Sequence, residues 1–484
     1  MFVPEEFNFY IYRQKQRDGT ESDSMHLAPI DWILIGLYML FAIGVGIFYS
    51  RKASQNIDEF FVSGRNLPWW IAGTSMVATT FAADTPLFVS GVIATEGIAG
   101  NWLWWNLAAT HVMATLFFAR LWHRSGILTD LELLDIRYSG RPARVLRGFR
   151  SLWEGILLNC IVMGWVMLAM LKILGVFVDW PKWSTLGVLL AVALSYSIMS
   201  GFWGVVMTDV LQFAIAMSAS IGLAIIVVDK SGGMTAIKTQ LYTMYADKAD
   251  DILNFVPQVG SSYLPLTTFV AFIAVNWWAT KLADGGNYLA QRMFSAKDEK
   301  HSFFATLWFT IAHYCLRPWP WIVVGLATMV VFPNLPDPEV GYPKMVLKFL
   351  PSGLLGLMLV SFLAAFMSTI DTQVNWGTSI LLNDFYKAFL RRGKSDRHYV
   401  TASRAISLLL LILGTVTAAL MQTIKGGWEL FYGMSAGIGG VYIARWFWWR
   451  VNAWSEIAAW VSSAVVYSAL YLYNQHHPTE LYTV

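Results

Sequence analysis

The chain has 484 residues, of which 56% are hydrophobic and 13% charged, with a formal net charge of +3 and a mean hydropathy of +0.50. An ordinary soluble domain carries about 25% charged residues. The composition therefore excludes a soluble multidomain enzyme, a coiled coil and a disordered scaffold, because none of them could keep so much apolar surface out of water. The small net charge, without a basic run interleaved with aromatic residues, argues against a nucleic-acid partner.

The first 24 residues are polar and of mixed charge, and they lack the apolar centre of a signal peptide. Met25, which follows them, is a second candidate for the start of the chain. We expect residues 1–29 to form a polar tail outside the cytoplasm.

Beyond this tail, a window of about 20 mostly apolar residues finds twelve candidate membrane spans. The apolar runs are long and lack the ten-residue alternation of a membrane β-barrel, so the expected fold class is an all-α integral membrane protein. The candidate spans are residues 30–50, 67–91, 102–122, 151–177, 183–200, 204–228, 263–283, 302–332, 349–386, 403–424, 428–448 and 453–473.

Roughly two thirds of the 34 Lys and Arg residues fall between alternate spans, and they concentrate in residues 51–65, 120–150, 281–300, 387–404 and 445–450. Because positive charge collects in cytoplasmic loops, these segments are expected inside the cell. Both ends of the chain are then expected outside. The loop 229–262 between two spans is expected to be external and partly helical.

The second span is interrupted at mid-membrane depth by the run 78–86, which ends in Asp84, Thr85 and Pro86. Pro86 lacks an N–H and disfavours helix at Thr85, which would leave carbonyls one turn earlier free to bind a cation. A simple proline kink is the alternative. It does not explain Asp84, because an intramembrane carboxylate costs about 2.5–3.5 kcal/mol unless it faces a cavity.

The seventh span is interrupted in the same way by Asn276, Lys281 and Asp284, followed by Gly285 and Gly286. Five spans separate the two interruptions, so each would be the first helix of a five-helix set. Two broken helices at corresponding positions indicate an inverted-repeat transporter with its substrate between the breaks. Alternatively, Lys281 and Asp284 lie at the cytoplasmic interface.

In the ninth span, Ala365, Ser368, Thr369 and Thr372 recur at helical spacing beside Asp371. Such a stripe can serve helix packing, but hydroxyls together with carbonyls of an unwound neighbour also suit a hard monovalent cation. Asp209, in the sixth span, is a further intramembrane carboxylate that could guide a cation toward the cytoplasm or interact with a helix terminus.

Five segments together resemble the sodium:solute symporter family, which includes bacterial sodium/proline, sodium/sialic acid and sodium/galactose transporters. The segments are SGRNLPWW (63–70), TDLELLDIRYSG (129–140), GFWGVVMTDVLQ (201–212), AQRMFSAKDEK (290–300) and MSTIDTQVNWGTSILLNDFYK (367–387). The resemblance covers about residues 30–473.

This resemblance implies a LeuT-type fold of two inverted five-helix repeats with flanking helices. The extra N-terminal helix would be 30–50, the ten-helix core 67–448, and the C-terminal helix and tail 453–484. Within the core, repeat one would be 67–228 and repeat two 263–448. Most family members end with a further helix, so the chain is expected to be shortened by comparison.

The family's main sodium site corresponds to the carbonyls of Ala78, Phe81 and Ala365 and the hydroxyls of Ser368 and Thr369. A second cation site or exit path corresponds to Asp209, Ser368, Asp371 and Thr372, although Asp371 stands where the described site has a hydroxyl. The glutamate of the sugar transporter aligns near Trp104, and the second break has about three extra residues, so galactose specificity is not supported. Candidate substrate contacts lie in the breaks or among nearby aromatic residues: Thr80, Asp84, Thr85, Trp104, Asn276, Trp277, Trp278, Lys281 and Trp428.

The sequence therefore predicts a sodium-coupled symporter in the inner membrane of a bacterium that imports a small sugar, amino acid or carboxylate. Its partners would be the solute, sodium and the lipid bilayer. A proton-coupled transporter, with Asp84, Asp209 or Asp371 as carrier, and a membrane sensor that binds solute without transport are the alternatives. A membrane-embedded enzyme is disfavoured because the spans hold no paired nucleophile and base.

Overall fold

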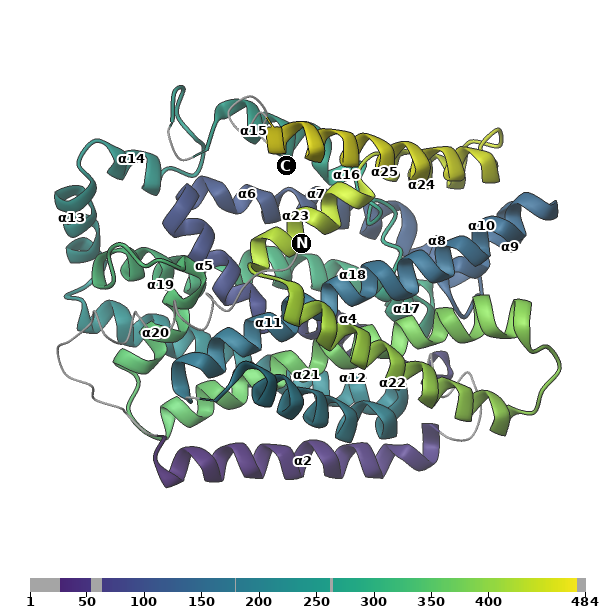
Figure 1. Cartoon of the computed structure of the whole chain (residues 1–484), viewed down its shortest axis with the longest axis horizontal. Coiled ribbons are helices and arrows are strands. Elements are labelled where there is room, and N and C mark those ends of the chain that lie inside the picture. Colours follow the sequence, from purple (N-terminus) through teal and green to yellow (C-terminus); the bar gives the residue numbers. More distant parts are fainter. Residues whose placement is uncertain (1–26, 54–62, 179, 262–263, 477–484) are drawn as a thin grey trace.

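The computed structural model describes residues 27–53, 63–178, 180–261 and 264–476, which form a body of packed helices (Figure 1). The described part of the chain holds no β-strand, only an isolated parallel bridge between Leu67 and Ala296. The expected all-α fold class is confirmed. Residues 1–26, the larger part of the predicted tail, lie outside the described residues.

Ten of the twelve predicted spans correspond to apolar helices. Six of these helices are long and apolar enough to cross a membrane: Gly140–Phe177, Gly204–Lys230, Glu299–Val331, Leu354–Leu390, Asp396–Leu420 and Ala453–Asn474. A seventh is the bent pair α4 (Trp69–Thr80) and α5 (Asp84–Glu96). Three shorter apolar helices are Pro29–Val45, Lys182–Leu194 and Leu266–Ala279.

The other two predicted spans are helical in shorter pieces. The span 102–122 is divided into α6 (Trp102–Trp105), α7 (Leu107–Met113), η3 (Ala114–Phe118) and α8 (Ala119–Arg124). The span 428–448 is divided into α23 (Ile424–Ser435) and α24 (Gly439–Phe447), separated at Gly437, whose φ of 80° is readily adopted only by glycine. Length and apolarity alone therefore support six or seven crossing helices among the described residues, fewer than the twelve predicted.

The remaining helices follow the predicted order. Both the fifth and the sixth predicted spans lie within α12 (Lys182–Lys230), and the loop 229–262 contains α13 (Met234–Tyr245) and α14 (Lys248–Leu253). The others are α2 (Pro29–Ala53), α9 (Leu133–Arg137), α10 (Gly140–Leu152), α11 (Asn159–Phe177), α15 (Leu266–Ala271), α16 (Trp277–Ala279), α17 (Tyr288–Ser295), α18 (Glu299–Ile311), α19 (Pro318–Val331), α20 (Gly341–Phe349), α21 (Leu354–Ile380), α22 (Asp396–Leu420) and α25 (Ala453–His476).

Several helices contain π-helical turns, which occur frequently at functional sites. One of them, η6 (Phe272–Asn276), leads into the second predicted break, and another, η7 (Ala312–Leu316), ends directly before Arg317. The others in the described chain are η3, η5 (Trp153–Leu158) and η9 (Leu381–Leu390). Short 3-10 turns occur at Ser63–Arg65, Ile98–Asn101, Asp130–Glu132 and Pro338–Val340.

The helix α21 lies at the centre of the body. Nearly all of its residues are buried, and it packs against α2, α4, α11, α12 and α22. In Figure 1, α2 runs along the lower edge and α25 along the upper edge. The first and last helices therefore flank the helices between them.

Candidate functional site

The second predicted span is broken where the sequence indicates. The helix α4 ends at Thr80, α5 begins at Asp84, and their axes differ by 55°. Pro86 is the third residue of α5, a position whose N–H would have no helical partner in any case. Pro86 therefore favours the start of the second half-helix, and the carbonyl of Ala82, one turn earlier, accepts a hydrogen bond from Thr85 N–H at 3.2 Å. At the end of α4, side chains of other helices donate to the carbonyls of Thr79 and Thr80.

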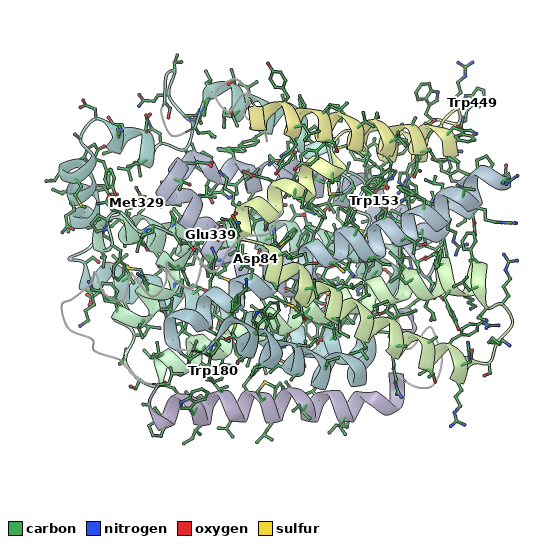
Figure 2. The ribbon with its side chains drawn as sticks, in the orientation of Figure 1. Asp84, Trp153, Trp180, Met329, Glu339 and Trp449 are labelled. Atoms are coloured by element: carbon green, nitrogen blue, oxygen red, sulfur yellow. The ribbon has the colours of Figure 1, made fainter. Side chains whose placement is uncertain are left out.

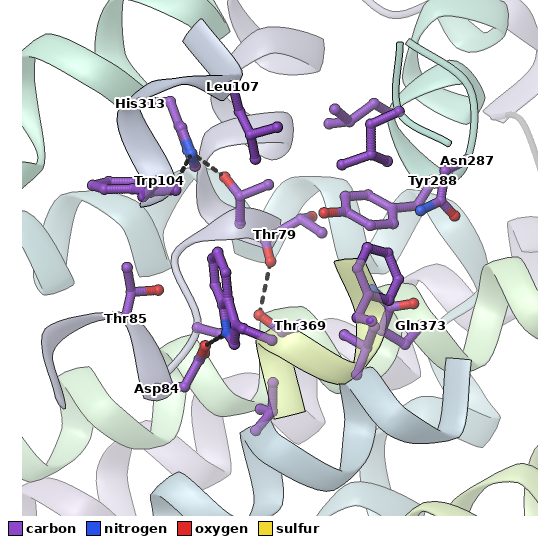
Figure 3. Close-up of a pocket in the computed structure, with 18 of the residues that line it drawn as sticks. Thr79, Asp84, Thr85, Trp104, Leu107, Asn287, Tyr288, His313, Thr369 and Gln373 are labelled. Carbon is purple, nitrogen blue, oxygen red and sulfur yellow. Dashed lines mark hydrogen bonds between the residues drawn. The ribbon is translucent and has the colours of Figure 1, made fainter. Parts of the chain in front are cut away.

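The central helix α21 meets this break through a hydroxyl. Thr369 Oγ1 donates a hydrogen bond of 2.8 Å to the carbonyl oxygen of Thr79, as Figure 3 shows. Of the predicted sodium ligands, Ala78 and Phe81 lie at the end of α4 and in the break, whereas Ala365, Ser368 and Thr369 lie on α21. All five residues are buried. The contact fits a sodium site, because it brings a hydroxyl and a main-chain carbonyl, both hard oxygen donors, to one place.

The predicted second cation set is built around an arginine. Asp209 accepts hydrogen bonds of 2.5 Å from both Ser75 and Ser368, and Arg292 Nη2 lies 3.7 Å from Asp209 Oδ2. The same Nη2 donates to the hydroxyls of Thr79, at 2.8 Å, and Thr372, at 2.7 Å. A guanidinium thus contacts Thr372 and lies near Asp209, two residues that were predicted to bind a cation.

Asp371, the remaining member of that predicted set, is also buried on α21. Arg292 is fully buried, although its sequence position placed it among the loop cations. Nothing in the local sequence AQRMF distinguishes it from a loop arginine, so sequence analysis missed its contact with the first break.

A second arginine caps the end of α4. Arg317 Nη2 donates to the carbonyl oxygen of Thr80 at 2.7 Å, and its Nη1 donates to the Thr80 hydroxyl at 2.9 Å. Its guanidinium also lies over the ring of Phe81, 4.8 Å from the centroid. A cation is favoured there because the C-terminus of a helix carries partial negative charge. The charge of Arg317 inside a predicted span was the signal that could have located it.

A pocket opens beside the first break (Figure 3). Trp104 Nε1 donates to His313 Nε2 at 2.9 Å, and His313 Nδ1 lies 2.9 Å from the Thr80 hydroxyl. Five of the predicted substrate contacts line the pocket: Thr80, Asp84, Thr85, Trp104 and Trp428. Sequence analysis missed the other lining residues, which include His111, Trp165, Asn287, Tyr288, His313, Tyr314, Gln373, Phe431 and Tyr432.

The predicted contacts from the second break do not line this pocket. The seventh span is indeed broken, between Ala279 at the end of α16 and Tyr288 at the start of α17. Trp277 accepts a hydrogen bond from Thr110 through its carbonyl. Other residues of this region, Leu282, Asn287 and Tyr288, line the pocket instead. The predicted residues that are absent from the lining are Asn276, Trp277, Trp278 and Lys281.

Lys281 and Asp284 belong to a buried network of charges. Lys281 Nζ lies 3.2 Å from Glu154, which also pairs with Arg150 at 2.6 Å. At the other end, Arg445 lies 2.7 Å from Asp284. Both Lys281 and Asp284 are almost fully buried inside the protein, and their position relative to the cytoplasmic interface stays a prediction.

The two halves of this network meet at the C-terminal helix. Glu456 of α25 lies 3.2 Å from Arg150 and 3.3 Å from Arg445. The positive-charge count behind the predicted orientation therefore includes four cations that are buried inside the protein: Arg150, Lys281, Arg292 and Arg445 are at most 2% exposed. Without them, the segments expected in the cytoplasm still hold more Lys and Arg than the others, and the orientation stays a prediction.

The geometry of this site defines a class of protein. Two interrupted apolar helices, a buried pocket beside the first interruption and a central helix with hydroxyls against it are the parts of a secondary transporter. Comparison with family models then identifies the family, because that of the sodium:solute symporter family matches residues 60–460. The chain belongs to this family, and sodium is its co-transported ion.

Similar proteins agree with this assignment. The chain is 25% identical over 466 residues to a sodium/glucose cotransporter 4 of Danio rerio, covering 88% of this chain and 69% of the relative. It is 26% identical over 463 residues to a sodium/glucose cotransporter of Vibrio parahaemolyticus, covering 90% and 84%.

A structural comparison establishes the fold. The structure of a substrate-bound, outward-open Na+-coupled sialic acid symporter is similar with a TM-score of 0.72, at 19% identity and 89% coverage of both chains. The expected LeuT-type fold is confirmed, and the chain is a multi-pass membrane protein.

Proposed function

We propose that this protein imports a small polar organic solute across the inner membrane of a bacterium, coupled to the inward movement of sodium. Sodium would bind between the end of α4 and α21, at the carbonyls of Ala78, Phe81 and Ala365 and the hydroxyls of Ser368 and Thr369. The observation that carries this proposal is the contact between Thr369 and the Thr79 carbonyl across the two helices.

The solute would bind in the neighbouring pocket, against Thr80, Asp84, Thr85, Trp104 and Trp428. Sodium that links α4 to α21 would favour the conformation competent to bind solute, which is coupling by differential affinity. At a membrane potential of 100 mV, each positive charge that enters releases about 2.3 kcal/mol, before any concentration term.

The repeat boundaries 67–228 and 263–448 belong to the same proposal. The two broken helices, α4/α5 and α16/α17, would be the first members of the two repeats. Alternating access would then move the two repeats around the pocket between the breaks.

The test is uptake of labelled sugars, amino acids and carboxylates into proteoliposomes with an imposed sodium gradient, potassium gradient or pH gradient. We expect accumulation of one solute with the sodium gradient alone. Accumulation with the pH gradient in the absence of sodium would favour the proton-coupled alternative. Solute binding without accumulation under any gradient would favour the sensor.

A further inference from the structure

We propose that the transported solute carries a positively charged ammonium group, which binds against Asp84. This inference rests on the proposed function, because it assigns the substrate class of the same pocket. Asp84 lies inside the helical body in Figure 2 and is 1% exposed. Its Oδ1 atom has no hydrogen-bond partner among the described residues, and Asp84 lines the pocket. A buried carboxylate oxygen without a partner costs free energy, which a bound cation would recover.

The carboxylate of Asp84 is stabilised by one side-chain hydrogen bond, by a helix N-terminus and by the charge of Arg317, with which it forms no ion pair. Trp428 Nε1 donates to Asp84 Oδ2 at 3.2 Å. Asp84 is also the first residue of α5, where the helix dipole favours negative charge. Within the described chain, no Lys or Arg nitrogen forms an ion pair with Asp84. Arg317 attracts the carboxylate from a greater distance, while its Nη atoms donate to Thr80.

The charged residues that line the pocket also favour a cationic solute. Asp84 is the one carboxylate among the described residues that line the pocket, and the lining contains no Lys or Arg. The Asp84 carboxylate would repel an anionic solute, and Arg317, which attracts Asp84, does not line the pocket. An ammonium group would form the missing ion pair, and a charge-assisted hydrogen bond is about twice as strong as a neutral one.

Aromatic rings complete the surroundings of an ammonium group. Trp428 is stacked on Phe88 with a centroid separation of 4.7 Å, and Trp165 lies 5.7 Å from Trp428. Phe431 and Tyr432 line the same pocket. The electron-rich faces of Trp, Tyr and Phe attract ammonium ions, most strongly where water is excluded. A carboxylate beside several rings therefore suits an alkylated or primary ammonium ion.

The first test measures binding to the full-length protein in detergent by thermal unfolding, in sodium chloride and in potassium chloride. The ammonium probes are choline and ethanolamine. The uncharged probes are 3,3-dimethylbutan-1-ol, in which carbon replaces the nitrogen of choline, and glucose, and the anionic probe is lactate. We expect an ammonium probe to raise the unfolding temperature in sodium, with at least tenfold higher affinity than any uncharged or anionic probe.

Variants of Asp84 supply the control for charge. Asp84→Asn should weaken ammonium binding at least tenfold, whereas Asp84→Glu should retain the preference for charge. Asp250→Asn, on the exposed face of α14, is the matched control and should change nothing. Stabilisation by glucose or lactate but by no ammonium probe, equal stabilisation by choline and its carbon analogue, or no stabilisation by either ammonium probe would overturn the proposal. Sodium-dependent stabilisation by glucose would overturn it while leaving sodium-coupled solute transport intact.

A second measurement does not depend on choosing the right solute. Thr85→Cys places a thiol in the pocket beside Asp84, in a background with Cys160 and Cys315 replaced. We compare its labelling rates with the cationic trimethylammonioethyl and anionic sulfonatoethyl methanethiosulfonates, each normalised to its rate with free cysteine. The cationic reagent should react at least tenfold faster, and Asp84→Asn should abolish the difference. A ratio near one with Asp84 present would overturn the proposal.

Discussion

Replacing Arg292 by Gln should create a place for a second sodium ion. The substitution removes the guanidinium that contacts Thr79, Thr372 and Asp209, and it leaves these oxygens without that cation. At an effective dielectric constant of 20, unit charges 3.7 Å apart attract by about 4.5 kcal/mol. Loss of one partner from a buried ion pair costs about 3–5 kcal/mol.

We therefore expect Arg292→Gln to lower the unfolding temperature strongly when potassium replaces sodium. Sodium should restore part of the loss, because an ion at 100 times its Kd stabilises the folded state by about 2.7 kcal/mol. Addition of Asp209→Asn should abolish this extra effect of sodium, because it removes the charge that attracts the ion.

The assay is thermal unfolding of purified protein across a sodium titration at constant ionic strength. Arg124→Gln is the matched control, because Arg124 pairs with Glu299 at 2.9 Å but is 66% exposed. Exposed pairs contribute about 0–1 kcal/mol. If Arg292→Gln destabilised the protein no more than Arg124→Gln, or responded to sodium like the unsubstituted protein, the inference that Arg292 occupies a cation position would be refuted.

Three further predictions address the sodium site, the buried network and the topology. Thr369→Ala should raise the sodium concentration for half-maximal thermal stabilisation about tenfold, since a hydrogen bond to a charged group contributes about 1.5–3 kcal/mol; an unchanged titration would exclude this ligand. Glu456→Gln should lower the free energy of unfolding by about 3–5 kcal/mol, because it weakens two buried ion pairs, and a change within the error of calorimetry would contradict that role. Single cysteines at the exposed positions Ser139 and Thr235 should react with an impermeant thiol reagent from opposite sides of the membrane; labelling from the same side would show that a helix between them is misplaced.

The positions of both breaks could be predicted from the sequence because their signals are local. Pro86 marks the start of α5, and Gly285, with a φ of 71°, lies in the second unwound segment. The helical class and most spans followed from apolar length in the same way. These features depend on residues close together in the chain.

The composition of the pocket could not be predicted in the same way, because it depends on contacts between distant segments. Arg292 is 213 residues from Thr79, and in sequence it looks like any cation in a loop. Lys281 is a predicted substrate contact, but its ammonium group pairs with Glu154, whereas Tyr288, which the sequence analysis does not single out, lines the pocket. Periodicity gives the face of a helix and does not give the partner that this face meets.

The order of Arg150, Arg445 and Glu456 along the chain has a consequence for biogenesis. Arg150 lies 306 residues before Glu456, and Arg445 lies 11 residues before it. Chains are made from the N-terminus, and domains generally fold in that order. Both buried arginines are therefore synthesised before the carboxylate that pairs with them. The charge network cannot close until α25 has been synthesised, so this step of folding follows insertion of that helix.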